Sequence, residues 1–156
     1  MEAAQTRAPE WRPNSSRATQ VICAARSDVG RVRDSNEDSL DFDVETGLLV
    51  LADGMGGCNG GEIASAMAVN IVSTEFRQLA LTLTQEESST PGLSQVAMRL
   101  CTAIAKANRE IFQLGLLQAH LSGMGTTLVT ALFCGARVTI ASIGDSRVYR
   151  LRQGHF

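Results

Sequence analysis

The residues best suited to chemistry lie where an apolar run ends, at Asp53-Gly54-Met55-Gly56-Gly57. A carboxylate at the end of a buried strand, followed by glycines that let the backbone turn sharply, presents oxygen atoms to a hard cation. An aspartate in a turn after a strand is also an ordinary structural residue. Asp53 is therefore a candidate ligand of Mg²⁺ or Mn²⁺ that needs support from other acidic positions.

A second acidic group lies upstream, in Arg33-Asp34-Ser35-Asn36-Glu37-Asp38. Adjacent carboxylates such as Glu37 and Asp38 repel each other unless a cation or its bound water offsets their charge, and the alternative is a solvated strand end. Arg33 is the candidate phosphate ligand, because a guanidinium can bind two phosphate oxygens with parallel hydrogen bonds. Arg31 is its neighbouring competitor and is expected to be solvated, as is Asp34.

Two further motifs lie downstream, Ser122-Gly123-Met124-Gly125-Thr126-Thr127 and Ile143-Gly144-Asp145-Ser146-Arg147. The first lacks the Gly-Lys-Ser/Thr ending of a P-loop and precedes a strand, so it is not expected to hold phosphate. Asp145 is either a metal ligand or an ordinary turn residue. Together the acidic motifs suit hydrolysis of a phosphate ester, in which two metal ions activate water and bind phosphate oxygens.

Composition excludes several other classes of function. The formal net charge of −2 over 156 residues argues against a surface that binds nucleic acid or an anionic membrane. No apolar stretch approaches the roughly 20 residues of a membrane span, and no secretory signal is expected. The four cysteines are widely scattered. This pattern favours reduced thiols and a cytoplasmic location over disulfides.

The periodicity of apolar residues predicts the elements that position these groups. Residues 1–20 are expected to be a disordered leader, and residues 21–156 a single domain. Helices are expected near 62–83 and 93–115, the second with apolar residues recurring every three or four positions. Strands are expected at residues 21–25, 38–44, 48–52, 126–133, 137–143 and 147–151, followed by a turn at 152–154.

The order of elements favours an α+β fold, because strands and helices do not alternate regularly. We expect an antiparallel sheet with the two helices side by side on one face. The run Leu48–Ala52 is apolar throughout, which predicts a strand covered on both faces.

Taken together, the four motifs resemble the metal-dependent protein phosphatase 2C (PPM-type) family in its bacterial form, from about Val21 to the last residue. The resemblance implies an antiparallel β-sandwich flanked by helices, with metal ions at one edge. It implies that Asp53 bridges two Mn²⁺ or Mg²⁺ ions and that Gly54 contributes its carbonyl. Glu37 and Asp38 would hold metal-bound water, Asp145 would help hold a third, weaker ion, and Arg33 would bind phosphate.

The function implied is that of a protein serine/threonine phosphatase in bacterial signalling. Its catalytic residues here would be Arg33 and Asp53, and its partners phosphorylated proteins, including a cognate kinase and its substrates. Neither nucleic acid nor a membrane is an expected partner.

Two aspartates that the family carries in late Asp-Gly and Asp-Asn motifs have no counterpart in residues 1–156. We therefore expect a C-terminally truncated domain with little or no activity of its own. One alternative is a non-catalytic pseudophosphatase or phosphoprotein-interaction module. Another is an unrelated Mg²⁺-dependent phosphohydrolase.

Overall fold

A computed structural model describes residues 21–56, 60–80, 95–134 and 137–156. The expected leader at 1–20 and Cys58 lie outside the described residues. The elements are β1 (Asp38–Asp43), β2 (Leu48–Met55), α1 (Gly60–Ala80), α2 (Gln95–Leu117), the 3-10 helix η1 (Ala119–Leu121), β3 (Gly125–Thr126), β4 (Leu128–Cys134) and β5 (Arg137–Ile143).

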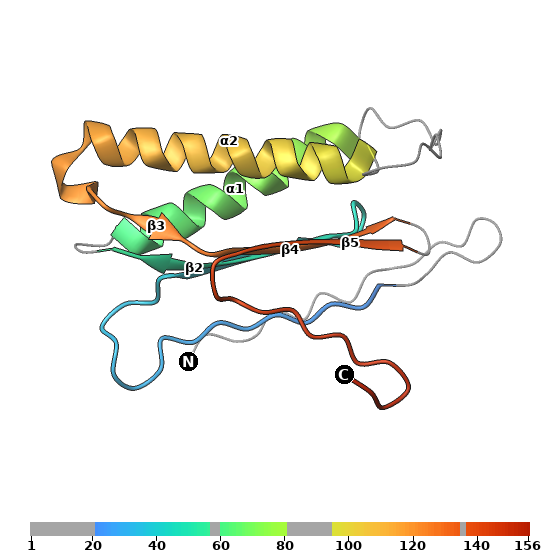
Figure 1. Ribbon diagram of the computed structural model, residues 1–156. Coiled ribbons are helices and arrows are strands. Elements are labelled where there is room, and N and C mark those ends of the chain that lie inside the picture. The colour runs from blue at the N-terminus through green and yellow to red at the C-terminus, as the bar shows by residue number, and fades with distance from the viewer. Residues whose placement is uncertain (1–20, 57–59, 81–94, 135–136) are drawn as a thin grey trace.

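The strands form one antiparallel sheet in the order β1-β2-β4-β5, and the short β3 pairs with the end of β2. Both helices lie on the same face of this sheet (Figure 1), with α1 against β1 and β2, and α2 packed on α1. The predicted antiparallel α+β arrangement with two helices on one face is confirmed. The predicted helix ends at 81–83 and 93–94 lie outside the described residues.

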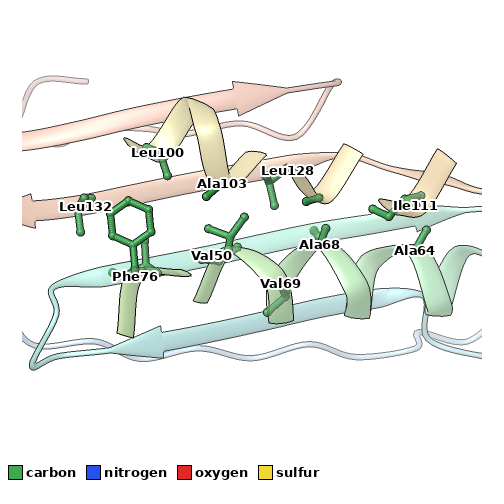
Figure 2. Close-up of a cluster of buried hydrophobic side chains, with 14 residues drawn as sticks. Val50, Ala64, Ala68, Val69, Phe76, Leu100, Ala103, Ile111, Leu128 and Leu132 are labelled. Carbon is green, nitrogen blue, oxygen red and sulfur yellow. The ribbon is translucent and has the colours of Figure 1, made fainter. Parts of the chain in front are cut away.

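The core lies between the sheet and the two helices, as Figure 2 shows. Strand residues Val50, Leu128 and Leu132 point toward the helices. Helix α1 contributes small buried residues such as Ala64 and Ala68, which allow the helix to approach the sheet closely. Helix α2 buries four residues of the predicted apolar stripe, Ala97, Leu100, Ala107 and Ile111, and also Ala103, which lies beside the predicted Ile104.

The prediction that β2 is covered on both faces is wrong. Leu48, Val50 and Ala52 are buried, whereas Leu51 is 42% exposed on the opposite face. Among the described residues, that face is crossed by two irregular segments, 21–26 and 147–149, which leave a hollow of about 390 Å³. β2 is therefore apolar on both faces, although only the face toward the helices is buried.

Those two segments were both expected to be strands, and neither is one. Residues 21–25 and 147–151 pair with no strand in the part of the chain that the structure describes, so they lack the ladder of hydrogen bonds that defines a strand. The predicted turn after them is confirmed. Arg152 and His155 exchange two main-chain hydrogen bonds of 2.8 and 3.0 Å around Gln153 and Gly154, both with positive φ.

The end of β2 meets the beginning of α1 at an unusually close approach of two glycines. A methyl group on Gly54 would overlap the carbonyl oxygen of Gly61 in the first turn of α1. The Gly54 amide also donates to the Glu37 carbonyl at 3.1 Å. This contact joins β2, α1 and the segment before β1 at one place.

Substituting Gly54 tests that contact. We expect Gly54→Ala to lower the free energy of unfolding by about 1–3 kcal/mol, because backbone atoms must move to admit the methyl group. Urea unfolding followed by circular dichroism measures the change. The matched control is Gly115→Ala in α2, where the nearest atom would be 3.3 Å away. Equal stability of the two variants would contradict the packing described.

Two buried hydroxyl groups offer a second test of the core. Within the described residues, Ser73 Oγ and Thr130 Oγ1 are buried without a hydrogen-bond partner. An unsatisfied buried polar group costs about 1–3 kcal/mol, so Thr130→Val is expected to raise the free energy of unfolding by about 1 kcal/mol. The control is Thr139→Val on β5, where the side chain is only half-buried. A destabilised Thr130→Val variant would show that the hydroxyl has a partner in solution.

Candidate active site

A cleft of about 680 Å³ lies at the sheet edge where β1 begins and β2 ends. Neighbouring antiparallel strands bring the start of one beside the end of the other, and the register places Asp38 directly opposite Asp53. The cleft is lined by Arg33, Glu37, Asp38, Asp53 and Gly54, among others. Five of the six residues that the sequence identifies as candidates thus border one space.

The remaining candidate, Asp145, acts on the same group from the turn after β5. Partial burial, then the negative charges of Asp38 and Asp145, raise the pKa of Asp53 above its ordinary value, while the positive charge of Arg33 lowers it. Asp53 stays largely exposed. A bound cation would reverse the part of the pKa shift that comes from repulsion between the carboxylates. Three carboxylates and one guanidinium therefore share one electrostatic environment.

The main chain of Asp53 is fixed by two threonines, one at the end of β3 and one directly after it. The Thr127 amide donates to the Asp53 carbonyl at 2.8 Å, and the Asp53 amide donates to Thr127 Oγ1 at 3.0 Å. Thr126 Oγ1 adds a hydrogen bond of 3.0 Å to the same carbonyl. The Gly-Met-Gly-Thr-Thr segment thus holds the main chain of Asp53 in place.

Thr127 also holds the turn that carries Asp145. Its Oγ1 shares a hydrogen bond of 2.7 Å with Ser146 Oγ. Gly144 has a φ of +91°, and a methyl group there would lie 2.8 Å from Thr127 Cγ2. Only a residue that tolerates positive φ and lacks a side chain fits this turn against Thr127.

Glu37 lies against the beginning of α1. A methyl group on Gly61 would come within 2.8 Å of Glu37 Oε1 and 2.9 Å of Oε2, so the half-buried carboxylate occupies the space that Gly61 leaves open. The positive end of the helix dipole favours a carboxylate at this position. Glu37 is therefore held beside the cleft by α1, separately from Asp38.

The two arginines of the preceding loop differ in position. Arg33 lines the cleft, whereas Arg31 does not border it. Asp34, which the sequence predicts to be a surface residue, is exposed and also borders the cleft. Sequence analysis missed the roles of Thr127, Ser27 and Asn36, of which the last two form hydrogen bonds with Asp38.

The donors at this edge are suited to a hard cation. All are oxygen atoms, which Mg²⁺ and Mn²⁺ prefer to the nitrogen and sulfur ligands chosen by softer metals. In the part of the chain that the structure describes, no three His, Cys, Asp or Glu side chains lie close enough to hold a metal ion. The site therefore fits an ion that keeps several water ligands, as Mg²⁺ usually does.

The sequence is similar to those of bacterial phosphatases. The serine/threonine phosphatase stp of Listeria innocua is 38% identical over 130 residues, which cover 81% of this chain and 48% of the relative. The serine/threonine protein phosphatase PstP of Mycobacterium tuberculosis is 40% identical over 140 residues, covering 89% of this chain and 24% of the relative. The chain spans about half the length of the Listeria relatives it matches.

Solved structures of bacterial serine/threonine phosphatases are also similar to this chain. The crystal structure of Mycobacterium tuberculosis PstP matches with a TM-score of 0.69 and 38% identity, over 84% of this chain and 50% of that one. A structure of the PstP catalytic domain in complex with two manganese ions has the same TM-score of 0.69 and covers 51% of that chain. Staphylococcus aureus Stp1 matches with a TM-score of 0.65 and 34% identity, over 80% of this chain and 47% of Stp1.

The family profile described as protein phosphatase 2C matches residues 30–156, which include all four sequence motifs and all six candidate site residues. The fold, the cleft and the sequence similarity agree, and the chain belongs to the protein phosphatase 2C family.

Proposed function

We propose that this chain provides the metal- and phosphate-binding edge of a protein serine/threonine phosphatase. The observation that carries the proposal is the convergence of Asp38, Asp53 and Asp145 with Arg33 at one end of the sheet. A cluster of like charges beside one guanidinium suits a site that binds cations together with an anionic phosphate. The relatives named serine/threonine phosphatases support this reaction class.

Asp53 is the proposed central metal ligand, together with the main-chain carbonyl of Gly54. Asp38 and Glu37 would hold metal-bound water, and Asp145 would help hold a third, weaker ion. The two manganese ions bound to the PstP catalytic domain support Mn²⁺ or Mg²⁺ as the cofactor. When bound, such a pair of ions supplies an activated water molecule and neutralises phosphate charge.

Arg33 is the proposed phosphate ligand. Its place on the cleft lets the guanidinium bind two oxygens of a phosphoserine or phosphothreonine. These hydrogen bonds would orient the phosphorus atom toward Asp38 and Asp53. Thr126 and Thr127 fix the main chain of Asp53 and so the point from which its carboxylate extends, which lowers the cost of positioning it.

Phosphorylated proteins are the proposed substrates, with a cognate serine/threonine kinase and its targets as partners. Most residues that line the cleft are charged or polar, as expected for a site that binds the phosphate group rather than a large apolar ligand. Neither described helix is long and apolar enough to cross a membrane. A cytoplasmic location remains our proposal from the scattered cysteines.

A second candidate function is that of a phosphoprotein-interaction module without turnover. It stays open because the late Asp-Gly and Asp-Asn motifs of the family have no counterpart in residues 1–156. Such a module would bind phosphopeptide through Arg33 without hydrolysing it. Turnover measurements distinguish it from the phosphatase.

The metal proposal predicts that the chain binds Mn²⁺ weakly and through Asp53. We expect Asp53→Ala to reduce Mn²⁺ affinity at least about tenfold, because it removes a direct carboxylate ligand. Isothermal titration calorimetry on the 156-residue chain measures this. The control is Asp34→Asn, which also removes one negative charge near the cleft. Equal losses in the two variants would mean that Asp53 contributes only charge.

The phosphate proposal predicts a kinetic effect of Arg33. The measurement uses a chimera in which residues 30–156 replace the matching segment of the Mycobacterium tuberculosis PstP catalytic domain. Arg33→Ala is expected to raise KM for a phosphopeptide about tenfold or more and to lower kcat less, because the lost contact binds ground state and transition state alike.

Arg31→Ala is the matched control for that measurement, since it removes the same charge from the same loop but not from the cleft. A similar rise in KM in both variants would show that Arg33 contributes no specific contact. A chimera that binds phosphopeptide through Arg33 but never releases phosphate would support the interaction module instead.

A further inference from the structure

Asp38 begins and ends a closed ring of three hydrogen bonds. Its main-chain amide donates to Asn36 Oδ1 at 3.1 Å. Asn36 Nδ2 donates to Ser27 Oγ at 2.7 Å. Ser27 Oγ in turn donates to Asp38 Oδ2 at 3.1 Å. The ring thus joins the main chain of Asp38 to its own carboxylate through two neighbouring side chains.

The direction of every bond in this ring is fixed by chemistry. A main-chain amide can only donate, so the oxygen of Asn36 must face it and the NH₂ group must face Ser27. Ser27 Oγ therefore accepts from Asn36 and keeps its single proton for the Asp38 carboxylate. An ionised carboxylate can only accept, which closes the ring without conflict.

The same bond between Asn36 and Ser27 closes the loop that carries Arg33. It joins two residues nine positions apart, at the two ends of residues 28–35. Within this loop the Gly30 amide donates to Asp28 Oδ1 at 2.9 Å, which forms a turn. Ser27 is therefore the point where the loop of the candidate phosphate ligand meets a candidate metal carboxylate.

We propose that Ser27 is a positioning residue that sets the orientation of the Asp38 carboxylate and the base of the Arg33 loop. Its hydroxyl holds Asp38 Oδ2 and so directs the rest of the carboxylate, which lies opposite Asp53 in the strand register. The inference rests on the metal-binding function proposed above. Ser27 touches no substrate and acts through Asp38 and Asn36.

The experiment measures Mn²⁺ binding to the full 156-residue chain by isothermal titration calorimetry. Groups that orient metal ligands typically change metal affinity by about 10–100-fold, and we expect Ser27→Ala to weaken binding within this range. Ser27→Thr keeps the hydroxyl and should restore affinity to within about threefold of the unmodified chain. Ser35→Ala, in the same loop but outside the ring, is the matched control.

A double-mutant cycle separates the ring from two independent contacts. Because Asn36 acts on Asp38 partly through Ser27, Ser27→Ala combined with Asn36→Ala should weaken Mn²⁺ binding less than the product of the single effects. If the double variant weakens Mn²⁺ binding by the product of the two single effects, the proposed coupling is overturned. So would a Ser27→Ala variant that binds Mn²⁺ as well as Ser35→Ala does.

A metal-free measurement keeps this inference separate from the proposed function. In the NMR spectrum recorded with a chelator present, the carboxyl carbon resonance of Asp38 should shift in the Ser27→Ala variant. It should return toward its original position in Ser27→Thr and stay unchanged in Ser35→Ala. If the unmodified chain binds no Mn²⁺, the proposed function fails, and these shifts alone decide whether Ser27 positions Asp38. An unchanged Asp38 resonance in Ser27→Ala overturns the positioning role.

Discussion

The pairing of Asp38 with Asp53 across β1 and β2 is the constraint on which the site depends. Side chains alternate between the faces of a strand, so a slip of one residue would turn one of these carboxylates to the other face. The register is set at the far end of the same hairpin, where Gly47 has a φ of +73° and a side chain would strike the Phe133 carbonyl. A turn far from the cleft thus determines which acidic groups meet within it.

Bringing carboxylates together is unfavourable unless something else holds them, and two separate parts of the chain do so. Thr127, between β3 and β4, forms hydrogen bonds with Asp53 and with the turn that carries Asp145. The first turn of α1 accommodates Glu37 at Gly61. The small residues of α1 that pack on the sheet therefore also determine where the Glu37 carboxylate lies, which links the hydrophobic core to the candidate site.

Local patterns in the sequence predicted the parts of the fold that depend on local contacts. The apolar stripe of α2 is buried against the core as expected. The alternation in β1 does not give one buried face, because Leu40 and Phe42 pair with Leu51 and Leu49 on the face away from the helices and all residues from Ser39 to Asp43 are half-buried. Residues 21–25 and 147–151 failed as strands because a strand needs a partner, which periodicity does not identify. The candidate acidic residues were found from their types, whereas the role of Thr127 depends on a contact with Asp53 across 74 positions.

The central claim is that this edge of the sheet binds a divalent cation between β1, β2 and the turn after β5. Paramagnetic broadening of amide resonances by substoichiometric Mn²⁺ tests it most directly, because the ion broadens signals near its own position. The account predicts that Asp38, Asp53, Gly54 and Asp145 broaden first, while the opposite end of the sheet near Leu48 keeps its signals. Broadening centred on another acidic region, such as Glu75 and Glu110 on the helices, with sharp signals at Asp53 would contradict it.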